Sequence, residues 1–341
     1  MFVDFTDDHL RPLDGSVVLI SGATGMIGGY LARSLLDSSK RLGIGPAKLV
    51  LLGRNPPLQE SLISQIVNDP LVDLRISDLT SPPRNLPKVD ICIHAASPAA
   101  PAIFQSDPVK TFKTNVNGLQ NLVEGPHFSS GSKFLLVSSG EVYGNQQPNG
   151  VSEDFVGGVL TTDPRSIYAE SKRAAESLLV AYGASLGFTS TIARLFHTFG
   201  PGVRESDTRI FGSLLWNAAK GEPLNIRSDG TAVRSFLDLS DAVRGLIDVV
   251  NHGLSGSAYN IGSPVGIRIR EFVELLQELF PTNHPEIEFD TLPSIDNYAV
   301  LPSVDKLKAL GWSPSVSLPE TITKTVGWIR NTISNNNRST D

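Results

Sequence analysis

A tyrosine and a lysine four residues apart have the clearest capacity for chemistry in this chain. Tyr168 and Lys172 open a helical stretch, and residues at i and i+4 share one face of a helix. An unperturbed phenol has a pKa of about 10, too high for a base at neutral pH, and a nearby ammonium lowers that pKa because it favours the phenolate. We therefore expect the pair to exchange a proton with an alcohol while a hydride moves to or from a nicotinamide.

Two further polar residues stand at the end of an apolar run, in the sequence Ser-Ser-Gly-Glu-Val-Tyr-Gly. Ser139 is expected to hydrogen-bond the reacting hydroxyl, with a cap on the following turn as the alternative. Glu141 is a candidate for a second proton transfer, in elimination or decarboxylation beside a keto group, because simple alcohol oxidation needs no further carboxylate. A solvated loop carboxylate is the alternative for Glu141.

Three glycines near the N-terminus predict a dinucleotide-binding loop. Gly22, Gly25 and Gly28 lie between an apolar strand and a helix. Glycine is needed there because the chain turns sharply and its backbone must approach a pyrophosphate closely. The phosphates would face the N–H groups of the helix start, at Met26 and Ile27. The alternative is a tight turn that only packs the helix on the sheet.

The end of the second predicted strand bears on the choice of dinucleotide. An acidic residue is expected there to bind the adenosine ribose, and the chain has Gly53 followed by Arg54. Arg54 would attract a 2′-phosphate, which points toward NADP, or it is a solvated loop arginine. We expect NAD, with NADP as the alternative that Arg54 raises.

The elements that must position these residues alternate between strands and helices. Apolar runs at 16–20, 49–52, 91–96 and 134–139 are typical of strands buried on both faces. A helix is predicted from Asp107, an N-cap followed by proline. Its apolar residues follow helical spacing: Val109, Phe112, Val116, Leu119 and Val123. The pattern predicts an α/β fold, a Rossmann-like doubly wound parallel sheet with a smaller C-terminal substrate-binding region.

The domain organisation follows from a change of pattern near residue 194, where loops lengthen and glycine and proline become frequent. The stretch 235–261 again indicates strand, helix and strand, and is expected to return to the sheet. We expect a dinucleotide-binding domain over 1–193 plus 235–262 and a nucleotide-sugar-binding domain over 194–234 plus 263–332. The polar residues 333–341 are expected to be disordered.

Composition excludes several classes of function. The 341 residues are 40% hydrophobic and 19% charged, with a net charge of -6, so binding of nucleic acid through a basic face is not expected. The single Cys92 cannot form an internal disulfide, and no Cys/His cluster has the spacing of a structural zinc site. The acidic N-terminus does not have the pattern of a signal peptide, and the apolar runs are too short to cross a membrane. We expect a cytoplasmic protein without metal.

Longer motifs carry a resemblance to a known family. The GxxGxxG spacing is similar to that of the short-chain dehydrogenase/reductases. From residue 16 to 282 the chain resembles the extended members that act on nucleotide sugars, most of all UDP-glucuronate decarboxylases. The matching stretches are HAASPAAP from His94, DPVKTFKTNVNG from Asp107, SSGEVYG from Ser138, DPRSIYAESKRAAE from Asp163, ARLFHTFGP from Ala193, GEPLNIRSDGTAVRSF from Gly221 and YNIG from Tyr259.

The resemblance implies roles for further residues. Cofactor contacts are implied for Asp78, Leu79, Ala95, Ala96 and Asn115. Substrate contacts are implied for Ser97, Glu141, His197, Arg209, Arg227 and Arg234. Arg234 would bind the nucleotide diphosphate, which needs a charge-assisted donor. Ser139, Glu141, Tyr168 and Lys172 would surround C4 and C5 of the sugar.

The chain departs from the family on the substrate side. His197 replaces a usual Asn, Gly140 a second hydroxyl residue, Arg227 an aromatic residue that stacks near the base, and Ser213 an Asn. His197 is a core histidine, a phosphate donor or a titrating group.

The implied reaction is a redox-neutral modification of a nucleotide-diphosphate sugar through a 4-keto intermediate, similar to UDP-glucuronate decarboxylation. A 4-epimerase and a 4,6-dehydratase are the alternatives within the class. An NADPH-dependent ketone reductase and a non-catalytic dinucleotide sensor are alternatives outside it. The resemblance also implies a homodimer, in which the helices from Asp107 and of Tyr168 pair across a two-fold axis.

Overall fold

A seven-stranded sheet forms the centre of the molecule. The computed structural model describes residues 2–58, 61–125, 128–144, 150–226, 228–281, 287–289 and 301–338. The strands are all parallel, in the order β11-β6-β5-β4-β1-β2-β3. Their bounds are β1 Val17–Ser21, β2 Lys48–Gly53, β3 Val72–Ile76, β4 Ile91–His94, β5 Lys133–Ser139, β6 Thr189–Leu195 and β11 Ser257–Ile261. Since the order reverses between β1 and β4, a crevice is expected at the carboxyl ends of these two strands.

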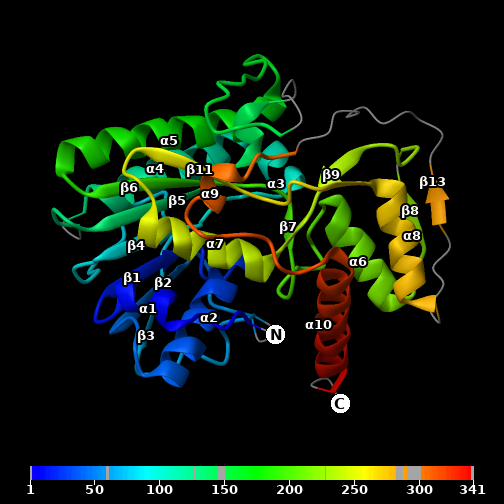
Figure 1. Ribbon diagram of the computed structural model, residues 1–341, viewed down its shortest axis with the longest axis horizontal. Coiled ribbons are helices and arrows are strands. Elements are labelled where there is room, and N and C mark those ends of the chain that lie inside the picture. Colours follow the sequence, from blue (N-terminus) through cyan, green and yellow to red (C-terminus); the bar gives the residue numbers. More distant parts are fainter. Residues whose placement is uncertain are drawn as a thin grey trace.

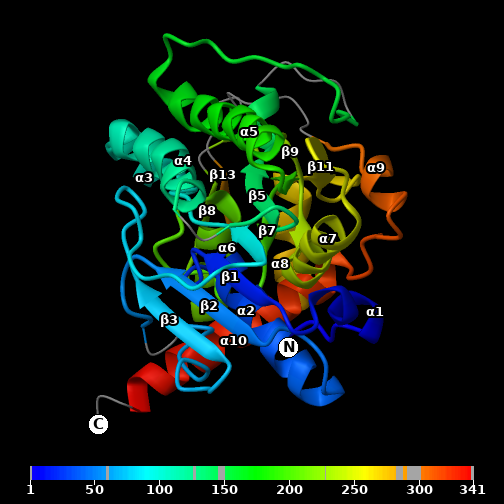
Figure 2. The same ribbon diagram turned by 90° about the vertical axis from the view of Figure 1, so that its left-hand side faces the viewer.

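The sheet is apolar on both faces because helices cover both. Helices α1 (Asp7–Leu10), α2 (Met26–Leu42) and α7 (Leu239–His252) lie on one face, and α4 (Pro108–Val123) and α5 (Ile167–Leu186) on the other (Figures 1 and 2). Successive residues of β1 alternate between the two buried clusters: Val18 and Ile20 belong to the first and Leu19 to the second. The predicted doubly wound fold is confirmed.

The predicted element starts agree closely with the structure. The Asp107 carboxylate accepts a 3.0 Å hydrogen bond from the Lys110 N–H, so Asp107 is the N-cap of α4 as expected. The predicted strand at 91–96 ends at His94 instead. Ala95 and Ala96 leave the sheet to pass against the glycine loop, where a Cβ placed on Gly22 would lie 2.8 Å from both residues.

A smaller region with its own aromatic core lies beyond the carboxyl ends of the strands. It contains the short strand pairs β7–β10, β8–β13 and β9–β12 and the helices α6, α8 and α10 (Figure 1). The bounds are β7 Thr198–Phe199, α6 Ile210–Lys220, β8 Leu224–Ile226, β9 Val233–Ser235, β10 Leu237–Asp238, β12 Gly266–Arg268, α8 Ile269–Leu279, β13 Ile287–Phe289 and α10 Leu318–Arg338. Phe199, Phe211, Phe236 and Phe272 pack together in its core.

The expectation of a disordered tail from residue 333 is corrected by the structure. Helix α10 continues to Arg338, because Ile333 packs against the apolar core of the smaller region and extends the buried face of the helix. Residues 339–341 lie outside the described residues.

The remaining short elements connect the larger ones. They are the helices α3 Pro101–Ser106 and α9 Asp305–Lys308 and the 3-10 turns η1 Arg11–Leu13, η2 Gly140–Tyr143 and η3 Pro164–Ser166. Among the described helices, none has the length and hydropathy that crossing a membrane would require.

Candidate active site

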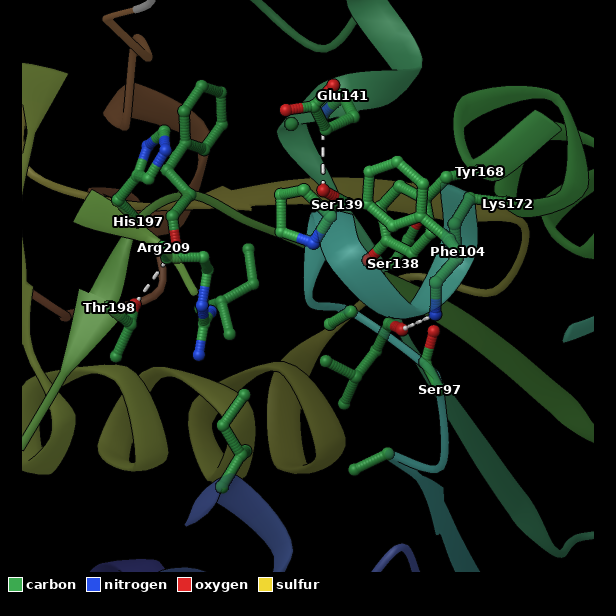
Figure 3. Close-up of a pocket in the computed structure, with 18 of the residues that line it drawn as sticks. Ser97, Phe104, Ser138, Ser139, Glu141, Tyr168, Lys172, His197, Thr198 and Arg209 are labelled. Carbon is green, nitrogen blue, oxygen red and sulfur yellow. Dashed lines mark hydrogen bonds between the residues drawn. The ribbon is translucent and has the colours of Figure 1, made fainter. Parts of the chain in front are cut away.

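A cavity of about 400 Å³ lies where the carboxyl ends of the strands meet the smaller region. The glycine loop, the end of β5, the start of α5, the segment after β6, Arg209 and Arg234 line it. Figure 3 shows Ser139, Glu141, Tyr168 and Lys172 toward one end of this cavity and His197, Thr198 and Arg209 toward the other. The predicted site residues that line it are Gly22, Gly25, Met26, Ile27, Gly28, Ala95, Ser97, Ser139, Glu141, Tyr168, Lys172, His197, Arg209 and Arg234. The fold therefore brings together residues from both halves of the chain.

The glycine loop fits a dinucleotide pyrophosphate. Gly22 has a φ of 73°, and a Cβ on Gly28 would lie 2.6 Å from the Gly22 carbonyl oxygen. Gly25 is the N-cap of the 17-residue helix α2 and offers no capping side chain, so the helix start is left for another acceptor. A helix N-terminus favours an anion at this place. The loop therefore has the geometry that pyrophosphate binding requires, and the contacts of its individual residues stay a prediction.

The expected adenosine end lies beside this cavity, at the ends of β2 and β3. The Asp78 carboxylate accepts hydrogen bonds from the Thr80 N–H (3.0 Å) and the Thr80 hydroxyl (2.9 Å). The bond from the Thr80 N–H, followed by that from its hydroxyl and by the charges of Lys110 and Arg54, holds the pKa of Asp78 below its usual range. Arg54 is exposed, and its charge acts on Asp78. Asp78 therefore closes a turn with its side chain, and its implied contact with the cofactor stays a prediction.

Leu79, Ala96 and Asn115 lie behind the cavity and support its wall. Leu79 is buried against α4, and its carbonyl oxygen accepts a 2.8 Å hydrogen bond from Asn121 Nδ2. Asn115 is buried; its Oδ1 accepts from Ser97 Oγ and its Nδ2 donates to Ser171 Oγ, both at 2.8 Å. Asn115 therefore ties the loop after β4 to the helix that carries Tyr168.

Ser139 caps the turn that follows it, which is the alternative considered for it. Its Oγ accepts a 3.2 Å hydrogen bond from the Glu141 N–H at the start of η2 (Figure 3). The hydrogen bond from Ser139 to a reacting hydroxyl stays a prediction. Glu141 is exposed at the mouth of the cavity. This capping hydrogen bond fixes the backbone that positions the side chains of Ser139 and Glu141.

Tyr168 is buried, and its pKa moves opposite to the expectation. Burial raises the pKa of the Tyr168 phenol, and the charge of Glu141 raises it further. Side-chain hydrogen bonds with Ser139 and Ser97 and the charge of Arg209 act in the other direction without cancelling the burial. The net shift is upward, so the expectation that Lys172 lowers the pKa of Tyr168 is corrected.

The side chain of Lys172 explains that correction. Lys172 Nζ donates a 2.8 Å hydrogen bond to the carbonyl oxygen of Val137 in β5. Burial lowers the pKa of Lys172 to about 8, while the charge of Glu176 opposes the shift. The i and i+4 positions share a helix face, as predicted, but the ammonium reaches past the phenol to the strand.

Two arginines and a histidine line the substrate side. Arg209 Nε donates to Asp207 Oδ1 at 2.9 Å, and its guanidinium lies 4.6 Å from the centre of the Phe211 ring. Arg234 is half-buried in β9 and lines the cavity. Arg227 lies outside the described residues.

His197 is neutral at neutral pH. Burial, and then the charges of Arg234 and Arg209, lower its pKa to about 3. Its ring meets the rings of Phe236 and Phe211 edge-on, at centroid distances of 6.1 and 6.5 Å. The low pKa favours the core histidine and the phosphate donor over a group that titrates near neutrality.

Gly140 is the departure that the structure explains most directly. A Cβ on Gly140 would lie 2.9 Å from the Phe196 ring, closer than real Cβ contacts. A hydroxyl residue at this position would require Phe196 to move.

Sequence reasoning missed three residues that shape the cavity. Arg165 lines it from η3, three residues before Tyr168, a spacing that offered a signal. Asp207 orients Arg209. Phe104 lines the cavity from α3, a helix of six residues, too short to show a period.

The chain is similar to known proteins over most of its length. Residues 18–262 match the NAD dependent epimerase/dehydratase family. UDP-glucuronic acid decarboxylase 3 of Arabidopsis thaliana is 34% identical over 89% of this chain and 86% of its own length. An epimerase of Methanothermobacter thermautotrophicus has the same fold, with a TM-score of 0.81 at 23% identity over 97% of both chains. A dTDP-glucose 4,6-dehydratase of Streptomyces venezuelae with NAD bound has a TM-score of 0.80 at 22% identity, over 93% of this chain and 98% of its own.

The fold and the cavity define a dinucleotide-dependent enzyme of the extended short-chain dehydrogenase/reductase type. The chain belongs to the NAD dependent epimerase/dehydratase family. The predicted cofactor, NAD, and the prediction of an enzyme are confirmed at this level.

Proposed function

We propose that the protein modifies a nucleotide-diphosphate sugar through a 4-keto intermediate and acts as a decarboxylase of a nucleotide-linked uronic acid. The observation that carries this proposal is the position of Glu141, whose N–H is bound by Ser139 and whose charge acts on Tyr168. A second proton-transfer group beside the acid–base tyrosine is of use when oxidation at C4 leads to a step at C5. The 34% identity to a UDP-glucuronic acid decarboxylase supports the same reaction.

Each polar residue near the reacting carbon has its own part in the proposed reaction. Tyr168, as phenolate, accepts the proton of the sugar 4-hydroxyl, and Ser139 holds that hydroxyl by a hydrogen bond. NAD, held by the glycine loop of Gly22, Gly25 and Gly28, would supply the acceptor and later the donor of the C4 hydride, so that the cycle would be redox-neutral. The 4-keto group then takes up the electron pair of the C5–C6 bond as carbon dioxide leaves. Glu141 governs the proton that returns to C5, and Tyr168 protonates the regenerated 4-oxygen.

The charges of the cavity suit a nucleotide diphosphate. Arg209 and Arg234 come from the smaller region and line the same cavity as the glycine loop. Asp207 holds Arg209 in place, and His197, which lines this cavity as well, offers an N–H without a further charge. We assign these residues, with Ser97 and Arg227, to substrate binding.

The alternative functions differ from a decarboxylase in the chemistry that they require. A 4-epimerase or a 4,6-dehydratase would share the oxidation at C4 and would differ in the steps that follow at C4 to C6. A ketone reductase would consume NADPH, which Arg54 favours and Glu141 opposes. A dinucleotide sensor would need no intact Ser139, Tyr168 and Lys172.

We further propose a homodimer, and a division into a dinucleotide-binding domain (1–193 plus 235–262) and a nucleotide-sugar-binding domain (194–234 plus 263–332). Val109 and Phe112 on α4 are 64% and 36% exposed, which gives this helix an apolar outer face. The return of β11 to the sheet supports counting 235–262 with the dinucleotide-binding domain.

The test is incubation of the purified protein with UDP-glucuronate, and then mass spectrometry of the nucleotide sugars and of the retained cofactor. Release of carbon dioxide with formation of the UDP-pentose supports the proposal. UDP-glucose and dTDP-glucose serve as parallel substrates, and turnover of either of them alone would favour the epimerase or the dehydratase.

A further inference from the structure

Two aromatic rings lie flat against each other beside the reacting position. The rings of Phe104 and Tyr168 have a centroid distance of 4.9 Å and an interplanar angle of 16°. Both side chains are buried, with exposed fractions of 4% and 6%. Figure 3 shows the phenylalanine ring across the tyrosine ring, on the side of the cavity that also holds Lys172 and Ser139.

Phe104 is the residue that anchors its short helix in the interior. Helix α3 has six residues, and Phe104 is the one that is buried; its neighbour Ile103 is 50% exposed. The N-cap residue Ala100 offers no capping side chain. Pro101 and Phe104 both line the cavity from this helix, and Phe104 does so through the stack on Tyr168.

The stack leaves the hydroxyl of Tyr168 directed at polar neighbours. Interactions with the side chains of Ser139, at the end of β5, and Ser97, in the loop after β4, lower the pKa of the phenol against the larger effect of burial. Ser97 in turn donates to Asn115, which fixes its position. With one ring face covered by Phe104, the plane of the phenol is defined.

We propose that Phe104 is a positioning residue for Tyr168: its ring fixes the plane of the phenol and keeps water from one face, so that the hydroxyl stays aimed at the reacting alcohol. This inference rests on the proposed acid–base role of Tyr168. A base held in its working geometry avoids the loss of rate that results from small misplacements.

The stack also bears on when Tyr168 can ionise. Water stabilises a phenolate, so a covered ring stays protonated to higher pH. The charged groups facing this part of the cavity are Glu141 from η2, Arg165 from η3, Arg209 before α6 and Lys172 on α5. None of these groups is removed when only Phe104 is changed, so the charges present at the site are the same in the variant.

Phe104→Ala and Phe104→Leu test the proposal, with Ile103→Ala on the same helix as the matched control. Ultraviolet titration of each variant against its Tyr168→Phe double variant reports the ionisation of Tyr168 without any substrate. We expect Tyr168 to ionise at lower pH in Phe104→Ala, at an intermediate pH in Phe104→Leu, and as in wild type in Ile103→Ala. Unchanged ionisation in both Phe104 variants would overturn the proposal. If Phe104→Ala does not fold, Phe104→Leu decides.

The activity profile gives a second readout. Because the phenolate is the acting base, the acid limb of the kcat/KM profile should move to lower pH in Phe104→Ala, while the plateau falls roughly tenfold or more. If the acid limb and the plateau of the kcat/KM profile were both unchanged in Phe104→Ala, Phe104 would have only a packing role. If Tyr168→Phe itself retains full activity, the proposed function fails, and the substrate-free titration still decides the stack.

Discussion

Lys172 and Val137 join helix α5, which carries Tyr168, to strand β5, which ends at Ser139. Lys172 Nζ donates a 2.8 Å hydrogen bond to the Val137 carbonyl oxygen. Val137 lies two residues before Ser139 on β5, so this bond sets α5 and Tyr168 against the end of the strand. Burial lowers the pKa of the lysine to about 8, which still leaves it largely protonated at pH 7. The lysine therefore acts on the geometry of the site.

Tyr168→Phe and Glu141→Gln should separate the two halves of the reaction. Tyr168→Phe removes the hydroxyl and should lower hydride transfer by roughly 10² to 10⁴. Glu141→Gln should still oxidise the substrate at C4 and stop before the step at C5, with reduced cofactor accumulating. Stopped-flow absorbance of the reduced nicotinamide distinguishes a silent variant from an arrested one. Turnover of Glu141→Gln at the wild-type rate would leave epimerase or reductase as the better account.

Gly25→Val should abolish retention of the dinucleotide. A Cβ on Gly25 already lies 3.2 Å from the Gly22 carbonyl oxygen, and two further methyl groups would stand where a pyrophosphate must approach. The measurement is the nicotinamide released from acid-denatured protein. Gly327→Ala is the control, because a Cβ there has no neighbour within 4 Å. Nicotinamide at wild-type level in Gly25→Val would contradict the assigned loop.

His197→Asn should reduce the loss of stability in acid. The pKa of His197 is about 3 in the fold and 6.5 in an ordinary environment, so the unfolded chain takes up a proton that the fold does not between these values. Stability is then fully present above pH 6.5 and falls as pH drops toward 3, by up to about 1.4 kcal/mol per pH unit. Urea unfolding at pH 7 and 4.5 measures the slope. His252→Asn at the exposed end of α7 is the control, and equal slopes in the two variants would refute the assignment.

Phe112→Asp combined with Val109→Glu should convert a dimer to a monomer. Buried carboxylates without partners are costly, so an interface built on this face of α4 would not form. Sedimentation velocity at micromolar concentration makes the measurement, with Leu254→Asp as the control because Leu254 is 69% exposed in the turn after α7. A wild-type protein that sediments only as a monomer would contradict the proposed homodimer.

Much of the architecture was predictable because the central strands are continuous apolar runs and α4 begins with an N-cap and a proline. The direction of Lys172 was not, since its partner is a backbone carbonyl on a strand 35 residues away. The end of α10 was missed for a similar reason: the apolar contacts of Ile333 lie in the smaller region, distant in sequence. Phe104 lies on a helix too short for a periodic signal.

The path of the chain between the sheet and the smaller region has a practical consequence. The chain leaves the sheet after β6, returns through α7 to β11, and leaves again toward β12 and α8. The chain between β6 and β11 thus contributes three residues to the wall of the cavity: His197, Arg209 and Arg234. This segment begins and ends at neighbouring strands, because β11 pairs directly with β6. A recombination crossover placed near residue 195 would separate these paired strands. Exchanging specificity between relatives would therefore require a cassette inserted at two junctions, not a C-terminal swap.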